Sequence, residues 1–247
     1  MDRPSIFTLE HITFAYPERP VLFQDLGFSL REGEHIGLHG PNGCGKTTFL
    51  RLVMGLETPQ SGRILYQGEL VDNGAALHRM RCGIGFVMQN SDDQLFSATV
   101  LEDVAFGPFN LGLKRRQAKD RAMETLERME LENLADRATH RLSAGEKKMV
   151  SIASMLSMRP HALLLDEPTS SLDDNARNRI IGILQKEVQA RIIVSHDKNV
   201  LGQTASTFIR INGSGGIDAL PSAFSQVVGC HEARLVRDGA TRSKLCR

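Results

Sequence analysis

The hydrophobic residues of this chain follow two different periods, which predict where strands and helices lie. Apolar and polar residues alternate from residue 6 to residue 16, the period of a β-strand with one buried face. Short and mostly apolar runs at 162–165 and 191–194 predict strands that are buried on both faces. At 115–129 the apolar side chains instead lie on one face of a helix. Strands that alternate with helices in this way are typical of an α/β fold.

A phosphate-binding loop is predicted between a strand at 35–39 and a helix that follows it. Two glycines stand five positions apart and are followed by a lysine and a hydroxyl residue. Glycines let the backbone take positive φ, so that N–H groups and the helix dipole point at phosphate oxygens. Lys46 is expected to reach the β and γ phosphates, and the Thr47 hydroxyl to hold Mg²⁺. The predicted nucleotide-binding residues are Gly40, Pro41, Asn42, Gly43, Cys44, Gly45, Lys46, Thr47 and Thr48.

Two adjacent carboxylates, Asp166 and Glu167, end the apolar run at 162–165. At the end of a buried strand they would repel each other without a nearby cation. Because the same chain carries a phosphate loop, Mg²⁺ is the natural counter-ion. Asp166 is therefore expected to hold the metal, and Glu167 to orient or deprotonate an attacking water. A pair that only caps the next helix is the alternative interpretation.

Two further side chains are candidates for nucleotide contacts. The run at 191–194 leads to His196, at the edge where open α/β sheets bind ligands, so His196 is expected to contact the γ-phosphate. Tyr16 ends the first predicted strand. If the first strands form an antiparallel layer beside the phosphate loop, its ring can stack on adenine. An aromatic residue that merely caps the core is the alternative for Tyr16.

Composition excludes several classes of partner. The chain has 247 residues and a formal net charge of +1, so it has no basic field for nucleic acid and no nucleic-acid partner is expected. Its apolar runs fall far short of the roughly 18 residues of a membrane span. Residues 1–4 show no apolar stretch of signal length, so the protein is expected to stay in the cytosol. Its four cysteines show no paired spacing, which agrees with a reducing compartment.

A helix start is predicted at residues 142–146. Ser143 is a good N-cap, and Glu146 three residues later completes a capping box. From residue 150 the chain then continues as a buried helix.

Taken together, these motifs resemble those of the ATP-binding cassette (ABC) ATPase family, in the family's order, from about residue 7 to residue 211. The resemblance implies ATP hydrolysis and a RecA-like P-loop α/β core with an antiparallel β layer and an inserted helical subdomain at about residues 90–159. It also implies that Gln89 contacts Mg²⁺ and senses the γ-phosphate. The matching motifs are the loop at 40–47, Gln89, the signature Leu142, Ser143, Ala144, Gly145 and Glu146, the pair Asp166 and Glu167, the turn Ser171, Leu172 and Asp173, and His196.

By the same resemblance two subunits sandwich two ATP molecules. Ser143, Gly145 and Glu146 of one subunit then face the nucleotide held by the phosphate loop of the other. A helix N-terminus with a serine and a glycine suits a γ-phosphate. Ala144 replaces the first glycine of the usual signature, and activity is expected to survive this departure.

A narrower resemblance is to the ATPase subunits of energy-coupling-factor importers, especially the cobalt and nickel branch. It is carried by residues 89–113 and 139–141. It implies an integral membrane subunit that docks near 89–108, a second ATPase subunit that is a copy or a paralogue, and a location at the cytoplasmic face of the membrane. The carboxylates Asp92, Asp93, Glu102 and Asp103 fit a groove for a basic helix, and a solvated acidic face is the alternative.

Two other functions stay open as alternatives. One is a vitamin importer of the same design, since an ATPase subunit does not touch the solute. The other is a soluble regulatory ATPase that binds nucleic acid or ribosomes, which the single cassette and the net charge of +1 disfavour.

The end of the chain has no family likeness. The cassette is predicted to span 1–212, followed by a Gly/Ser linker and a tail at 213–247. Cys230, His231 and Cys246 could be imagined as metal ligands there, but their spacing does not favour it.

Overall fold

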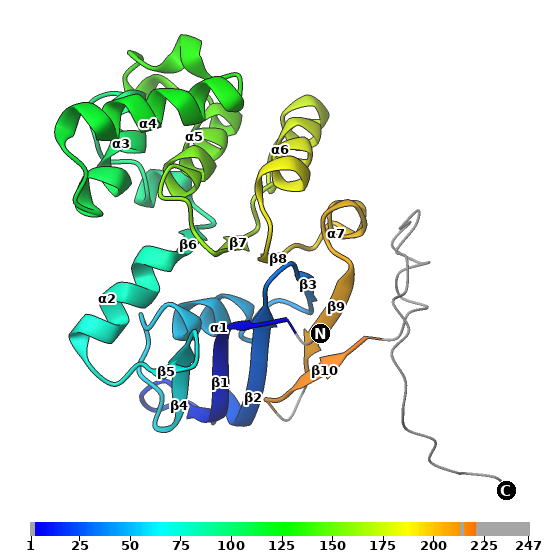
Figure 1. The fold of residues 1–247 in the computed structure, drawn as a ribbon. Helices are drawn as coiled ribbons and strands as arrows, with labels where there is room; N and C mark the ends of the chain where they lie inside the picture. The colour runs from blue at the N-terminus through cyan, green and yellow to red at the C-terminus, as the bar shows by residue number, and fades with distance from the viewer. Residues whose placement is uncertain (1–2, 213–214, 221–247) are drawn as a thin grey trace, which may run out of the picture.

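Two β-sheets of different kinds form the centre of the chain (Figure 1). The computed structural model describes residues 3–212 and 215–220. The smaller sheet is antiparallel, with the strand order β2-β1-β4-β5, and confirms the layer expected from the N-terminal alternation. Its strands are β1 (Ser5–Phe14), β2 (Phe23–Arg31), β4 (Ser61–Tyr66) and β5 (Glu69–Leu70).

The larger sheet has six strands in the order β10-β9-β3-β8-β7-β6. Five of them are parallel, and β10 runs antiparallel to β9. The carboxyl ends of the parallel strands therefore meet at one edge of the sheet. The strands are β3 (His35–His39), β6 (Ile84–Val87), β7 (Ala162–Asp166), β8 (Arg191–Val194), β9 (Thr207–Ile211) and β10 (Ile217–Ala219).

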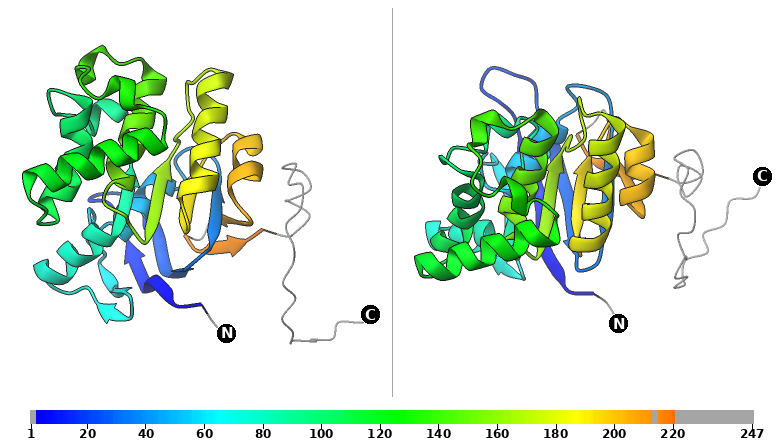
Figure 2. Two further views of the ribbon diagram at one scale, coloured as in Figure 1. Left: turned by 45° about the horizontal axis from the view of Figure 1, so that its top comes forward. Right: turned by 90° about the horizontal axis from the view of Figure 1, so that it is seen from above.

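Helices cover the larger sheet and extend beyond it as a lobe. In Figures 1 and 2, α3, α4 and α5 lie together in this lobe, and α6 and α7 stand beside it. Among residues 3–212 and 215–220, no helix is both long and apolar enough to cross a membrane. The α-helices are α1 (Lys46–Val53), α2 (Gly74–Gly83), α3 (Val100–Asn110), α4 (Arg115–Arg128), α5 (Ala144–Leu156), α6 (Asp174–Glu187) and α7 (Lys198–Thr204), and the 3₁₀ turns are η1 (Ser91–Asp93), η2 (Glu132–Leu134) and η3 (Thr139–Arg141).

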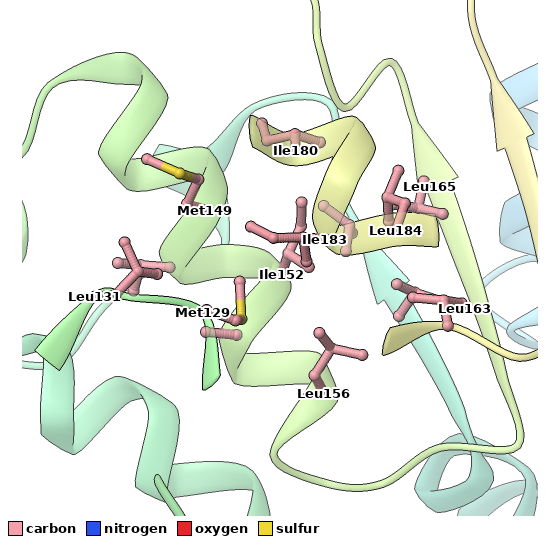
Figure 3. Packing of buried hydrophobic residues seen from close by; sticks show 14 of the residues in the cluster. Met129, Leu131, Met149, Ile152, Leu156, Leu163, Leu165, Ile180, Ile183 and Leu184 are labelled. Atoms are coloured by element: carbon pink, nitrogen blue, oxygen red, sulfur yellow. The ribbon is translucent and has the colours of Figure 1, made fainter. Parts of the chain in front are cut away.

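Separate apolar cores lie on the two faces of the parallel sheet. Successive side chains of β7 point to opposite faces, as the period of a strand requires. Leu163 and Leu165 belong to the core shared with the helical lobe, whereas Leu164 belongs to the core shared with α1 and the antiparallel layer. Figure 3 shows the first of these cores, where side chains of α5 and α6 pack against β7.

Two elements lie outside the sequence prediction. One is α2, which follows β5 and whose N-cap Asn73 accepts a hydrogen bond of 3.0 Å from the Ala76 N–H. The other is β10, which pairs with β9 inside the segment predicted as a tail after the Gly/Ser linker. The described part of the sheet thus extends beyond the predicted boundary at 212. Cys230, His231 and Cys246 lie outside the described residues.

Candidate nucleotide-binding site

The predicted phosphate loop joins the carboxyl end of β3 to the start of α1. Gly43 and Gly45 have φ of 78° and 102°, which confirms that the loop uses positive φ. A Cβ added to Gly45 would lie 3.0 Å from Phe23 Cζ, so space as well as backbone conformation favours glycine there. The first N–H groups of α1 therefore follow directly from the loop, in the arrangement that binds phosphate.

Lys46 is held over the loop that precedes it. Its side chain is buried, and Nζ donates hydrogen bonds of 2.8 Å to the carbonyl oxygens of both Gly40 and Pro41. The ammonium group thus lies at the mouth of the loop, where an anionic ligand would gain a charge-assisted contact.

Two of the three residues predicted to contact Mg²⁺, Thr47 and Asp166, meet at the end of β7. Thr47 Oγ1 donates a hydrogen bond of 2.7 Å to Asp166 Oδ2, although the two residues are 119 positions apart. Burial raises the pKa of Asp166 above its usual value, while the Thr47 hydroxyl and the Lys46 charge oppose that shift. A cation at this point would stabilise the buried carboxylate.

Glu167 turns sharply away from the end of β7. Its φ is 48°, in the left-handed region that a residue with a side chain rarely adopts, and its N–H donates to Val194 O at 3.0 Å. Glu167 Oε1 is buried and has no hydrogen-bond partner among the described residues, and it lies 3.3 Å from Nε2 of His196. Burial raises the pKa of this carboxyl group, and the nearby His196 opposes the shift.

The helix-capping alternative for the acidic pair does not agree with these contacts. The following helix, α6, is capped by Asp173, whose side chain accepts a hydrogen bond of 2.9 Å from the Ala176 N–H. Asp166 and Glu167 instead face the phosphate loop and His196.

Tyr16 packs against the core and also lies beside the phosphate loop. Its ring packs edge-on against Phe14, with the ring centroids 4.9 Å apart, as a core-capping residue would. Its hydroxyl lies 3.2 Å from Oγ1 of Thr48 in the phosphate loop. Tyr16 also lines a cavity together with residues of the phosphate loop, so its ring remains accessible to a base.

A cavity of about 860 Å³ brings most of the predicted site residues together. Side chains absent from the prediction also line it, among them Arg19, Thr169 and Arg177, which come from loops and from the first turn of α6 without a motif of their own. The predicted residues that line it are Tyr16, Asn42, Gly43, Gly45, Lys46, Thr47, Thr48, Gln89, Asp166, Glu167 and His196.

The signature residues lie elsewhere. Ser143, Gly145 and Glu146 are not among the described residues that line this cavity. The predicted capping box is confirmed, since Ser143 Oγ accepts from the Glu146 N–H at 3.3 Å and Glu146 Oε2 accepts from the Ser143 N–H at 2.7 Å. The second oxygen of Glu146 pairs with Arg137 at 3.0 Å. Both oxygens of Glu146 are therefore engaged within its own chain.

Comparison with known proteins identifies the family to which this chain belongs. The model of the ABC transporter family matches residues 23–170. The chain belongs to the ABC transporter family. It is therefore an ATP-binding ATPase with the RecA-like P-loop fold of that family.

Several relatives of this ABC ATPase are transporter subunits. A Nitratidesulfovibrio vulgaris protein, described only as an ABC transporter ATP-binding protein, is 49% identical over 84% of this chain and 76% of its own length. The energy-coupling factor transporter ATP-binding protein EcfA of Methanothermobacter thermautotrophicus is 39% identical over 83% of this chain and 67% of its own. The cobalt import ATP-binding protein CbiO of Rhodobacter capsulatus is 43% identical over 72% of this chain and 64% of its own length.

Solved structures agree with the fold of this ABC ATPase. CbiO1 of Clostridium perfringens, part of the transporter complex CbiONQ, superposes with a TM-score of 0.77 at 34% identity and covers 87% of both chains. A dimeric ATP-binding cassette with bound ADP and Pi superposes with a TM-score of 0.76 at 26% identity, over 87% of this chain and 99% of that one.

The ABC ATPase also contains a buried lysine that the sequence analysis missed. Lys148 is 4% exposed, and its Nζ donates to Met88 O at 2.9 Å and Gln89 O at 2.7 Å. Burial lowers the pKa of Lys148 to about 8, while Asp166 and Glu167 oppose the shift. Its helical spacing from the buried Ile152 and Leu156 was a signal, since a charged residue on an apolar helix face needs a partner.

The acidic groove predicted for a membrane partner is corrected. Asp103 is only 4% exposed, and its carboxylate accepts from the N–H groups of Phe96 and Ser97. Asp92 pairs with Lys147 at 2.6 Å. Asp103 is therefore not part of an acidic surface, and Lys147 offsets the charge of the exposed Asp92.

An apolar groove lies in the helical lobe of this ABC ATPase instead. Phe96, Phe106 and Phe109 are exposed, and the first two rings pack edge to face with centroids 4.7 Å apart. A groove of about 410 Å³ is lined by Phe106 and Phe109 and also by the charged residues Glu102, Arg115 and Lys119.

Proposed function

We propose that this chain is the ATP-hydrolysing subunit of an energy-coupling-factor importer that moves cobalt or nickel ions through integral membrane partners. The observation that carries the proposal is the convergence of Lys46, Asp166 and Glu167 in one cavity, in a chain 43% identical to a cobalt import ATP-binding protein over 72% of its length. The convergent residues supply the chemistry of ATP hydrolysis, and the similarity to the cobalt import protein indicates the cargo.

ATP would lie across the cavity with its phosphates at the start of α1. The loop N–H groups and the Lys46 ammonium bind the β and γ phosphates. The Tyr16 ring stacks on adenine, since it lines the same cavity at the level of Thr48.

The residues at the end of β7 fit Mg²⁺, a hard cation that prefers oxygen ligands. Thr47 and Asp166 supply a hydroxyl and a carboxylate that are already in contact, and the Gln89 side chain lines the same cavity. Bound there with ATP, the ion would supply charge neutralisation for the phosphates. The raised pKa of Asp166 agrees with a carboxylate that needs a cation.

Hydrolysis would proceed by in-line attack of water on the γ-phosphate. Glu167 orients the water and takes its proton, since Oε1 is a buried acceptor without a hydrogen bond. The γ-phosphate is contacted by Gln89 and by His196, which lies 3.3 Å from that oxygen of Glu167. Lys46 spreads the negative charge of the γ-phosphate.

The site would be completed by a second ATPase subunit. Ser143 and Gly145 lie outside the cavity of their own chain and would face the nucleotide of another subunit, while Glu146, held by Ser143 and Arg137, would support the helix start that carries them. Ala144, the departure from the family signature, is an exposed residue in the first turn of α5 and displaces none of the capping contacts.

The apolar groove of the helical lobe would receive the membrane partner, at the cytoplasmic face of the membrane. Exposed aromatic side chains are the residues that most often anchor a partner in a groove. The charges of Glu102, Arg115 and Lys119, which also line the groove, would orient the incoming helix.

Purification from membranes tests this proposal. The tagged chain, expressed in its own host and extracted in mild detergent, is expected to carry an integral membrane subunit with it. Phe106→Asp should lose that subunit and retain nucleotide binding, whereas Leu70→Asp, which alters an exposed apolar residue on β5, should retain both. Recovery of no integral partner with the parent chain would overturn the proposal and favour the soluble regulatory ATPase.

The cargo needs a separate measurement. The purified complex in liposomes is expected to take up radiolabelled cobalt or nickel only when ATP is supplied on the side of the ATPase. ATP-driven uptake of a vitamin, with none of either metal, would overturn the metal assignment and establish the vitamin alternative.

A further inference from the structure

A buried lysine links the signature helix to the segment that carries Gln89. Lys148 lies in the second turn of α5, and its ammonium group donates to the carbonyl oxygens of Met88 and Gln89 at 2.9 Å and 2.7 Å. These carbonyls directly follow β6, where the chain leaves the parallel sheet. A buried ammonium is costly unless it makes strong hydrogen bonds, so these contacts are the reason that the fold tolerates the charge.

A second contact fixes the same segment one turn further along α5. The Gln94 side chain accepts from the Met88 N–H at 3.1 Å and donates to Ser151 O at 3.1 Å. The backbone at Met88 is therefore attached to α5 through its N–H by way of Gln94 and through its carbonyl by way of Lys148. Two attachments at adjacent turns of α5 restrict both the rotation of the segment at Met88 relative to α5 and its distance from α5.

We propose that Lys148 is a positioning residue that ties Gln89 to the signature helix, so that Gln89 and Ser143 move as one body. The inference rests on the proposed function, in which Gln89 contacts the γ-phosphate of its own subunit and Ser143 that of the second subunit. Lys148 is not among the described residues that line the nucleotide cavity. It would transmit the position of one contact to the other.

This arrangement separates binding from turnover. Nucleotide binding by one subunit depends on the phosphate loop, which makes no hydrogen bond to Lys148 among the described contacts. Turnover requires Gln89 to be in place when α5 meets the second nucleotide. Loss of Lys148 should therefore lower kcat and leave the KM for ATP nearly unchanged.

Hydrogen exchange tests the tether directly. Lys148→Met keeps the unbranched apolar stem and removes the donors, so the amides of 88–95 are expected to exchange at least about tenfold faster, with those of 46–53 unchanged. Lys148→Arg retains donors and should restore much of the protection. The matched control is Lys147→Met, which removes the exposed pair between α5 and Asp92 of the same segment and should change the exchange at 88–95 far less than Lys148→Met does. Parental protection at 88–95 in Lys148→Met, or in Lys148→Gln if the methionine variant does not fold, would overturn the tether.

A double-mutant cycle on ATPase activity tests its consequence. Lys148→Met is expected to lower kcat about tenfold in the parent, but less than about twofold in the Gln89→Ala background, because the two residues act in series. Lys148→Arg should rescue part of kcat, which a general loss of stability would not predict. Independent, multiplying effects would overturn the inference.

The two failures are distinguishable. If Gln89→Ala turned over ATP at the parental rate, the proposed role of Gln89 would be refuted and the catalytic consequence of Lys148 with it. Unchanged hydrogen exchange in Lys148→Met would refute the tether alone and leave the proposed function intact.

Discussion

The phosphate-loop cavity and the signature end of α5 satisfy their polar groups in opposite ways. In the cavity, Glu167 Oε1 is buried without a hydrogen bond, and the pKa values of two carboxylates are raised by burial. At the start of α5, Ser143 and Glu146 satisfy each other, and the pKa of Glu146 is lowered mainly by the backbone N–H of Ser143. One region keeps a buried carboxylate oxygen without a hydrogen bond among the described residues. The other is a finished helix end that faces outward.

This difference explains why a single chain holds only part of a catalytic site. Unmatched buried carboxylates are costly, and a cation or a reacting water relieves that cost. A capped helix N-terminus has no such internal demand, but its N–H groups still favour an anion brought by another molecule. Substitutions in one region should therefore leave the structure of the other intact.

The largest effect is expected from Glu167→Gln. Loss of the general base should lower kcat by about a hundredfold or more, while ATP still binds and holds the subunits together as a dimer. Phosphate release and light scattering with ATP measure the two properties, and Asp174→Asn, at an exposed carboxylate of α6, serves as the control. Hydrolysis near the parental rate would refute the role of Glu167.

A mixing experiment tests whether the two regions act on the same ATP from different subunits. Lys46→Ala and Ser143→Arg should each lower kcat by about a hundredfold, because each removes one side of the phosphate contacts. Mixed together, they should regain activity, since a mixed dimer contains one site with both wild-type residues. No recovery in mixtures shown to exchange subunits would contradict the shared site.

Tyr16→Ala should raise the KM for ATP by about tenfold, the value of one stacked base. Tyr16→Phe keeps the ring and should stay close to the parent in initial-rate measurements. An unchanged KM with a lowered melting temperature in Tyr16→Ala would show that the ring only caps the core beside Phe14.

The smallest effect is expected from Glu146→Gln, which weakens the capping box and should cost about 1 kcal/mol of unfolding free energy at neutral pH. Because the folded pKa of Glu146 is lowered, this stability is present above the pKa of the unfolded chain and is lost as pH falls through the folded value. Urea unfolding at a series of pH values measures the difference from the parent. Glu127→Gln on α4 is the control, and a difference that grew as pH fell would contradict the assignment.

Sequence reasoning succeeded where neighbours along the chain determine the structure. The positive φ at Gly43 and Gly45 and the capping box at Ser143 follow from residues a few positions apart. The meeting of Thr47 and Asp166 was also predictable, because parallel strands end at one edge.

It failed where a distant partner decides the outcome. Asp103 was interpreted as part of an acidic groove, but its carboxylate is buried beneath the backbone N–H groups of Phe96 and Ser97. The carbonyl groups that accept hydrogen bonds from Lys148 are 59 and 60 positions away in the chain, and no sequence motif predicts these contacts. The helix α2 was missed because few of its residues are buried, chiefly Ala76 and Met80.

The short strand β10 has a consequence for shortened forms of this protein. It occupies the hydrogen-bonding edge of β9, from Ile217 opposite Ile211 to Ala219 opposite Ile209. A chain cut after residue 212 would leave that edge as a row of bare backbone groups, the template on which strands of other molecules pair and aggregate. The three residues of β10 form an edge in their turn, but a shorter one than the five of β9, and short edge strands limit such pairing.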